Sequence, residues 1–313
     1  MIASIEAGAE SLFQHMASSP DWQWESKILS ETPGHRLVTH YLIRTTNEKH
    51  RSNIIETVGK FYEDDAMGVH CYNTMCAIHG LLATRVNPPL AIPEPIFYSP
   101  DNKLLTLKWV DHRPYSELIN SRYYKHYLRL VGKALAYFHH LPMEYGQFKN
   151  IDDHLRELIM PHPLALAELL PRQAIRIQRI VHRLCEIEQR LVQHTISVPI
   201  HRDFHLRQLF CDGRKVWLID WDMYGLGDPA LDVGNFLVYL ATRIPAKSKS
   251  AGAAFLEGYQ SLMPNVSEAN IRLYEALTYL RLACKAYRLQ LQDWEIRAEE
   301  YLTQSENKLL MEN

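Results

Sequence analysis

Extended and helical patterns are separated along this chain, and that separation limits the possible folds more than any other feature. The first third contains alternating stretches at Trp24–Ser30, Arg36–Arg44 and Asn53–Tyr62, joined by polar turns at 31–34 and 45–50. These stretches predict an antiparallel meander. After Pro114 the apolar residues recur with a helical period almost throughout. The order predicts an α+β fold, in which a small antiparallel-sheet lobe precedes a larger, mainly helical lobe.

We expect the first lobe to span residues 1–111 and the second 112–313. In the first lobe, a short amphipathic helix is expected before residue 20, and strands return at Ile96–Tyr98 and Leu104–Val110. One further helix is predicted by an apolar stripe at Met67, Cys71, Met75, Ile78 and Leu82. The second lobe is expected to contain six helices, at Tyr123–Leu141, Pro171–His194, Leu231–Arg243, Lys249–Met263, Glu268–Gln290 and Trp294–Leu310.

Composition narrows the functional class. The chain has 313 residues and a net charge of −2, which argues against a partner as acidic as a nucleic acid. The longest stretch without Asp, Glu, Lys or Arg, Ala66–Thr84, is interrupted by histidines and amides, so we expect no membrane span. The first residues lack the basic start of a signal peptide. Five cysteines without a CxxC pair indicate reduced thiols, so we expect a cytoplasmic protein.

One extended island, Val198–Asp222, interrupts the helical region and carries most of the candidate chemistry. Asp212-Gly213 lies between two apolar runs and predicts a hairpin with a two-residue turn. Such a hairpin would bring Asp220 to the end of the ribbon that holds Asp203, His205 and Gln208. Carboxylate and amide oxygens are hard ligands of the kind that Mg²⁺ prefers, together with water and substrate phosphates.

The island resembles the aminoglycoside phosphotransferase and choline kinase family of kinase-like small-molecule phosphotransferases. The resemblance covers about residues 25–240 and keeps the order of the family's motifs. Its elements are His201-x-Asp203-x₄-Gln208, Leu218-Ile219-Asp220, Gly227-Asp228-Pro229-x₂-Asp232, Val58-Gly59-Lys60-Phe61, Lys108-Trp109-Val110 and Ala134–His139. It implies a protein-kinase-like two-lobed fold and an ATP- and Mg²⁺-dependent transfer of the γ-phosphoryl group to a hydroxyl of a small molecule.

The resemblance also implies a role for each matching residue. Asp203 would orient the acceptor hydroxyl and accept its proton late in the reaction, with His205 within reach of the transferring phosphate. Gln208 and Asp220 would hold Mg²⁺ on the phosphates of ATP or another nucleoside triphosphate. The nucleotide itself would be bound through Lys60, Lys108 and Val110, the last two at the hinge between the lobes.

Two departures from the family pattern keep an alternative open. Gln208 stands where the family usually has Asn, and residues 66–84 lack the Glu that usually fixes the nucleotide lysine. Glu63, Asp64 or Asp65 would have to replace it, unless Lys60 is held only with nucleotide bound. The alternative is therefore a catalytically weak or inactive kinase-like nucleotide-binding protein. A protein kinase fits less well, because Ile219-Asp220-Trp221 replaces Asp-Phe-Gly and only ten residues follow before the next helix.

Several other residues near the motif are better explained by structure than by chemistry. We interpret His201 as a buried support of its loop, Asp228 as a helix cap and Asp232 as a brace, and Asp222 as an auxiliary metal ligand or support. Residues 241–313 carry nine acidic and nine basic residues, so we expect a neutral or singly charged acceptor, not an aminoglycoside. No other partner is indicated, and the oligomeric state cannot be read from the sequence.

Overall fold

The computed structural model describes residues 22–32, 36–46, 52–143, 145–191 and 196–310. The helix expected before residue 20 lies outside these ranges, and the two turns of the meander lie partly outside them. The chain divides into two compact units. One contains the chain up to Arg113 together with Phe210–Asp222, and the other contains Pro114–Leu209 and the chain from Met223 onward.

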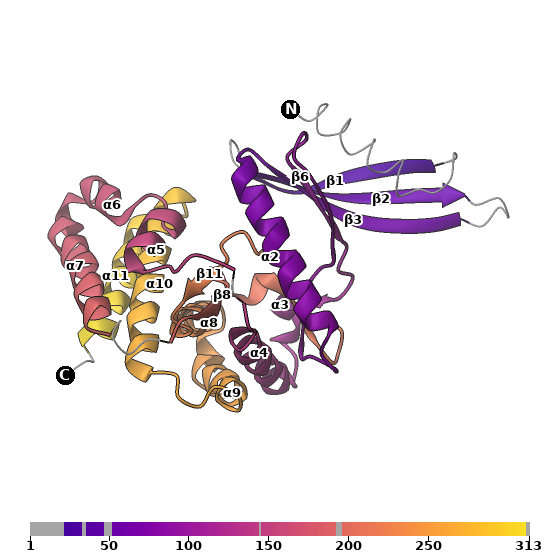
Figure 1. Ribbon diagram of the computed structural model, residues 1–313. Helices are drawn as coiled ribbons and strands as arrows, with labels where there is room; N and C mark the ends of the chain where they lie inside the picture. Colours follow the sequence, from indigo (N-terminus) through magenta and orange to yellow (C-terminus); the bar gives the residue numbers. More distant parts are fainter. Residues whose placement is uncertain (1–21, 33–35, 47–51, 144, 192–195, 311–313) are drawn as a thin grey trace. The chain divides into compact units, whose positions relative to one another are not determined.

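The first unit is built on a five-stranded sheet (Figure 1). Its strands follow the order β1-β2-β3-β6-β5, and all neighbours are antiparallel. Their bounds are Trp22–Thr32 for β1, Arg36–Thr46 for β2, Ser52–Tyr62 for β3, Pro95–Ser99 for β5 and Leu104–Lys108 for β6. Tyr41, Ile43 and Leu104 form a buried cluster on it. The predicted meander and the two later strands are confirmed.

Helix α2 (Asp65–Ala83) packs on this sheet against β3, β5 and β6. The Asp64 carboxylate accepts a hydrogen bond from the backbone N–H of Ala66, which begins the helix at the expected place. Four of the five residues in the predicted stripe are buried, which confirms a packing role, but Met67 at the first turn is 40% exposed.

The island forms a hairpin, but its turn is longer than predicted. Four residues separate strand β9 (Leu209–Cys211) from β10 (Val216–Leu218), so the predicted two-residue turn is wrong. The reason is the Asp212 side chain, which accepts hydrogen bonds from the backbone N–H groups of Arg214 and Lys215 and stabilises a wider loop. On its other side β10 pairs in parallel with β4 (Leu90–Ala91).

The second unit is mainly helical (Figure 1). The six predicted helices are present, as α4 (Tyr124–His139), α7 (Ala174–Leu191), α8 (Ala230–Arg243), α9 (Ser248–Gln260), α10 (Glu268–Arg288) and α11 (Trp294–Leu310). Helix α10 is central and packs against α7, α8 and α11. The sequence did not predict the short helices α3 (Tyr115–Leu118), α5 (Ile151–Leu158) and α6 (Pro163–Leu169), nor β11 (Gly225–Gly227), which pairs with β8 (Val198–Ile200).

Two glycines allow α4 and α9 to approach each other closely. A Cβ atom on Gly132 would lie 2.1 Å from the backbone oxygen of Phe255, and one on Gly258 would lie 2.1 Å from that of Arg129. Both contacts are far shorter than real Cβ contacts, so only glycine fits at these two positions.

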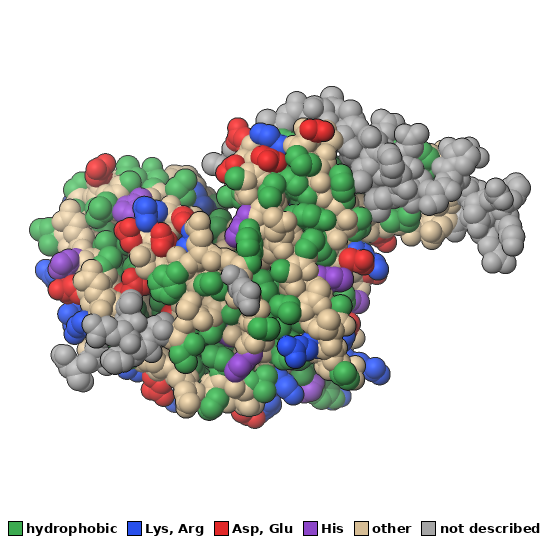
Figure 2. Space-filling view, in the orientation of Figure 1, with side chains coloured by type: hydrophobic (Ala, Val, Ile, Leu, Met, Phe, Trp, Pro, Cys, Tyr) green, Lys and Arg blue, Asp and Glu red, His purple; other side chains and the backbone are tan. Residues whose placement is uncertain are grey.

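The surface carries charges of both signs. Figure 2 shows acidic and basic side chains mixed on the visible face of the helical unit. In the described part of the chain, none of the helices has both the length and the apolar character that crossing a membrane requires. All five cysteines are described and are free thiols.

Candidate active site

Three polar side chains of the first unit share one face of the sheet. Lys60 and Tyr62 are two positions apart on β3, so both side chains point to the same side. Arg36 on β2 is directly opposite Tyr62, and residues paired across neighbouring strands also share a face. The register of the meander therefore places a guanidinium, an ammonium and a phenol together.

The chain segment after β10 brings two carboxylates to this group. The ammonium nitrogen of Lys60 lies 2.8 Å from Oδ1 of Asp220 and 2.6 Å from Oδ1 of Asp222. The Tyr62 hydroxyl donates to the same Asp222 oxygen at 2.7 Å. Arg36 contacts both carboxylates, at 3.0 Å for Asp220. Asp220 has a φ of +67°, a left-handed conformation that Asp tolerates better than most residues and that is frequent at functional sites.

This cluster is buried and balanced in charge. Lys60 is 5% exposed and Asp222 is 8% exposed. Burial acts to lower the pKa of Lys60, but Asp220 and Asp222 outweigh it and hold the pKa above its ordinary value. Burial, with Cys71 and Asp222 beside it, raises the pKa of Tyr62, so the phenol stays protonated and donates. Two cations thus face two anions, with Lys60 and Asp222 shielded from water and Arg36 and Asp220 partly exposed.

The residues expected to replace the missing helix Glu have other partners. Asp64 caps α2, and the Asp65 carboxylate accepts a hydrogen bond from the Tyr98 hydroxyl at 2.7 Å. No contact in the described part of the chain joins Glu63, Asp64 or Asp65 to Lys60. The lysine is instead held by Asp220 and Asp222. This corrects both alternatives, that a carboxylate near the start of the helix would hold it and that it would be held only with nucleotide bound.

The proposed hinge residues follow directly after the sheet. Lys108 ends β6, is exposed, and lies 3.5 Å from a carboxylate oxygen of Glu94. Val110 is half-buried in the irregular segment that follows. Within that segment the backbone N–H of Trp109 donates to the backbone oxygen of Glu56 at 3.2 Å, which ties it to the neighbouring strand.

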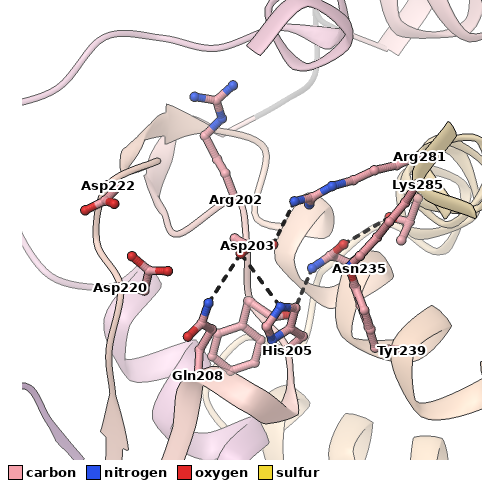
Figure 3. Close-up of polar contacts among 12 residues, drawn as sticks. Arg202, Asp203, His205, Gln208, Asp220, Asp222, Asn235, Tyr239, Arg281 and Lys285 are labelled. Atoms are coloured by element: carbon pink, nitrogen blue, oxygen red, sulfur yellow. Dashed lines mark hydrogen bonds and ion pairs between the residues drawn. The ribbon is translucent and has the colours of Figure 1, made fainter. Parts of the chain in front are cut away.

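In the second unit, Asp203 is the centre of a polar group (Figure 3). A guanidinium nitrogen of Arg281, from α10, donates to Oδ1 of Asp203 at 2.8 Å. The amide nitrogen of Gln208 donates to Oδ2 at 3.4 Å, and Nε2 of His205 lies 3.7 Å from the same oxygen. Gln208 ends η3 (Leu206–Gln208), a single 3₁₀ turn that begins directly after His205. The structure therefore brings three of the predicted site residues together and adds Arg281.

His205 is buried beside Asp203 in its neutral form. Its ring packs edge-on against Tyr239, with ring centres 4.7 Å apart. Burial lowers the pKa of His205 to about 4, with Arg281 and Lys285 acting in the same direction and Asp203 opposing them. At neutral pH the ring therefore contributes shape and a polar edge, and no positive charge.

A second carboxylate fixes the backbone of the loop that carries Asp203. Asp232, fully buried at the start of α8, accepts hydrogen bonds from the backbone N–H groups of His201 at 2.7 Å and Arg202 at 2.8 Å. Nε2 of His139 lies 3.2 Å from the same carboxylate. Arg202 has a φ of +68°, and Asp232 holds the chain in this uncommon conformation. Asp232 is thus a brace of the loop, as the sequence indicated.

Sequence reasoning missed Arg36 and Arg281. Arg36 could have been found, because the meander register pairs it with Tyr62, two positions from Lys60. Arg281 is 78 residues from Asp203 and lies on a helix with no motif of its own, so no local signal points to it.

Comparisons with known proteins identify the family of the chain and structures with a similar fold. Residues 68–297 match the phosphotransferase enzyme family, whereas no curated protein sequence matches the chain. A choline/ethanolamine kinase family protein from Mesorhizobium loti superposes with a TM-score of 0.60 at 14% identity, covering 99% of this chain and 95% of that one. The aminoglycoside phosphotransferase APH(2'')-Ib bound to ADP superposes with a TM-score of 0.59 at 15% identity, covering 96% of this chain and 98% of that one. Choline kinase from Cryptosporidium parvum superposes with a TM-score of 0.59 at 10% identity, covering 92% of this chain and 89% of that one.

These likenesses confirm the α+β kinase-like fold, with an antiparallel five-stranded sheet followed by a largely helical part. The match to the family extends over most of the chain. This chain belongs to the phosphotransferase enzyme family.

Proposed function

We propose that this protein is a small-molecule kinase that transfers the γ-phosphoryl group of ATP, or of another nucleoside triphosphate, to a hydroxyl group with the help of Mg²⁺. The observation that carries the proposal is the buried contact of Lys60 with Asp220 and Asp222. A buried ionic cluster is a weak source of stability, since desolvation offsets most of the attraction. A functional role explains its presence better than stability does. An ammonium beside carboxylates that can bind a metal ion is suited to phosphate binding.

Asp203 is the proposed catalytic base. The hydroxyl oxygen of the acceptor attacks the γ-phosphorus, the bond from that phosphorus to the bridging oxygen breaks, and the hydroxyl proton passes to the Asp203 carboxylate. Arg281, Gln208 and neutral His205 contact this carboxylate or lie beside it, which supports a fixed orientation. Positioning of this kind supplies much of the rate in phosphoryl transfer.

Gln208 and Asp220 are the proposed Mg²⁺ ligands, and their chemistry fits that ion. Both offer oxygen, and Mg²⁺ binds through one or two protein oxygens plus water and phosphate. The amide nitrogen of Gln208 faces Asp203, so the amide oxygen points away from that carboxylate (Figure 3). When bound, Mg²⁺ would neutralise charge on the β- and γ-phosphates. Lys60 would turn from its carboxylates to the phosphates, while Lys108 and Val110 would contact the rest of the nucleotide.

The second candidate is a nucleotide-binding protein with little or no turnover. The contacts that favour it are cationic partners on the proposed functional carboxylates, Arg281 on Asp203 and Arg36 and Lys60 on Asp220. A carboxylate that keeps such a partner accepts protons and metal ions less readily. All five cysteines are free thiols, which suits a reducing compartment. We therefore propose the cytoplasm for either function.

The test is a transfer assay with purified protein, Mg-ATP and a panel of sugars, amino alcohols, hydroxy amino acids and aminoglycosides. We expect acceptor-dependent release of ADP, lost in Asp203→Asn while nucleotide affinity stays near that of the wild type. In Asp220→Ala, Mg²⁺ should no longer tighten ATP binding. Nucleotide binding without transfer to any acceptor would favour the second candidate, and absence of nucleotide binding would exclude both.

A further inference from the structure

A pocket of about 420 Å³ opens in the helical unit beside the loop that carries Asp203. Its lining is formed by Ser116, Ile119, Asn120, Leu206, Arg207, Arg243 and Ile244. Arg207 directly precedes Gln208, and Arg243 lies in the last turn of α8. Both arginine side chains are exposed. None of the described residues that line the pocket is a carboxylate, and the ionic groups among them are the two guanidinium ions.

Further cations continue this positive region toward Asp203. Arg281 binds Asp203 directly, and the ammonium of Lys285, one helical turn later, lies 3.5 Å from the Tyr239 hydroxyl (Figure 3). Burial and the nearby charges of Arg281, Arg288 and Arg207 lower the pKa of Lys285 to about 8, against an opposing effect of Asp203. Arg207 and Arg243 also act on Tyr239, so they belong to the same neighbourhood.

The charges of the region are therefore unequal. The charges that act on Lys285 and Tyr239 come from four arginines, Arg207, Arg243, Arg281 and Arg288, and from one carboxylate, that of Asp203, which pairs with Arg281. Over residues 241–313 the acidic and basic residues are equal in number, but the structure gathers basic ones around this site. A concave site lined by one sign of charge attracts ligands of the opposite sign and repels those of the same sign.

We propose that the acceptor is a hydroxyl compound that already carries an anionic group, a phosphate monoester or a carboxylate, which Arg207 and Arg243 bind in the pocket. Guanidinium groups form paired, charge-assisted hydrogen bonds with both kinds of anion. The hydroxyl of the same molecule would be presented to Asp203 and phosphorylated by the step written above. This inference rests on the proposed function and names its substrate class. It also predicts that polycationic drugs and choline are poor acceptors, because the pocket repels them.

The test compares compounds that differ only in charge. Glycerol, glycerol phosphate and glyceric acid form one set, and glucose, glucose phosphate and gluconic acid form another, each assayed with Mg-ATP. We expect kcat/KM to be at least about tenfold higher for one charged member than for its neutral parent, since a charge-assisted contact is worth roughly that factor or more. The phosphate and carboxylate members show which anion the pocket accepts. A preference for the neutral members would overturn the proposal.

Variants of the pocket locate the effect. Arg243→Gln and Arg207→Gln should each raise KM for the charged acceptor about tenfold, change kcat less, and leave KM for the neutral parent nearly unchanged. Arg179→Gln, at an exposed position on α7 outside the pocket, is the matched control and should change neither constant. An equal loss with charged and neutral acceptors in the pocket variants would contradict the assignment.

Binding measured without turnover separates this inference from the proposed function. Calorimetry of the same charged compounds, with Mg-ADP saturating so that the nucleotide site is filled, should show binding that Arg243→Gln weakens. Such binding without any phosphoryl transfer would support the anionic pocket while the proposed kinase function fails. Efficient transfer to neutral or cationic acceptors alone would support the kinase function while the anionic pocket is refuted.

Discussion

The buried cluster around Lys60 allows a quantitative prediction about stability. Lys60→Met removes the buried cation that contacts both Asp220 and Asp222, and leaves Arg36 paired with the two carboxylates. Removing one partner of a buried pair typically costs about 3–5 kcal/mol. Asp222 is almost fully buried, whereas the Asp220 side chain is 20% exposed and partly screened by water. We therefore expect the low end, a loss of about 3 kcal/mol in the free energy of unfolding.

A second substitution tests whether charge imbalance is the cause. Lys60→Met combined with Asp222→Asn leaves one cation, Arg36, opposite one anion, Asp220. The double variant should recover at least about 1 kcal/mol relative to Lys60→Met, because the uncompensated charge is gone. Lys108→Met is the matched control. Its side chain is 67% exposed and its ammonium lies 3.5 Å from Glu94, so its loss should cost less than about 1 kcal/mol.

Urea unfolding followed by tryptophan fluorescence suits this measurement. Five of the six tryptophans, at positions 22, 24, 109, 217 and 221, lie in the first unit, so the signal reports mainly on the unit that carries Lys60. A Lys60→Met variant as stable as the Lys108→Met control would refute the reasoning. The reasoning would also fail if the double variant lost as much stability as Lys60→Met and Asp222→Asn lose together when measured singly, since the double-mutant cycle would then show no coupling.

Three further predictions concern the helical unit. Asp232→Ala should lower stability by about 2–4 kcal/mol, because it leaves two buried backbone N–H groups without an acceptor, and hydrogen exchange should show those amides opening. Gly132→Ala should lower the midpoint of thermal unfolding by separating α4 from α9, whereas Gly80→Ala, a control on α2 of the first unit where a Cβ meets nothing within 4 Å, should raise it slightly. Burial raises the pKa of Glu188 from 4.5 to about 7. The protonated carboxyl therefore makes its full contribution to folding stability below pH 4.5, and this contribution is lost as the pH rises through 7. Glu188→Gln should remove that decline, worth about 1–2 kcal/mol after allowance for its partial exposure, from the pH dependence of the unfolding free energy; an unchanged pH profile would contradict the assignment.

The sequence predicted the elements that have a long, clear period. Strand β2 and helix α2 are of this kind, because eleven or more residues repeat the pattern that burial on one face requires. Strand β1 is exposed from Glu25 onward and was predicted from its residue types and the turn that follows it. Helices α5 and α6 were missed because eight and seven residues give too few turns for a period to show. The predicted length of the turn after Cys211 was wrong because one side chain, Asp212, stabilises a wider loop than the Asp-Gly pair predicts.

Site residues followed the same division between local and long-range information. Asp203, Gln208 and Asp220 stand in one short segment, and its pattern is what makes them candidates. The partners that hold them could not be read locally, because Arg281 pairs with Asp203 across 78 residues and Arg36 with Asp220 across 184. The departure at α2 is explained in the same way. The lysine lacks a carboxylate from that helix because Asp222, 162 residues away, takes its place.

The central claim is that this member of the phosphotransferase enzyme family moves a phosphoryl group from a nucleotide to a small-molecule hydroxyl with Asp203 as the base. The most direct measurement uses ATP labelled in its γ-phosphoryl group and follows the label into the acceptor, in the wild type and in Asp203→Asn. The account predicts label in an acceptor of the panel for the wild type, and none for a folded Asp203→Asn protein that still binds Mg-ATP. Equal transfer of label by both proteins would contradict it.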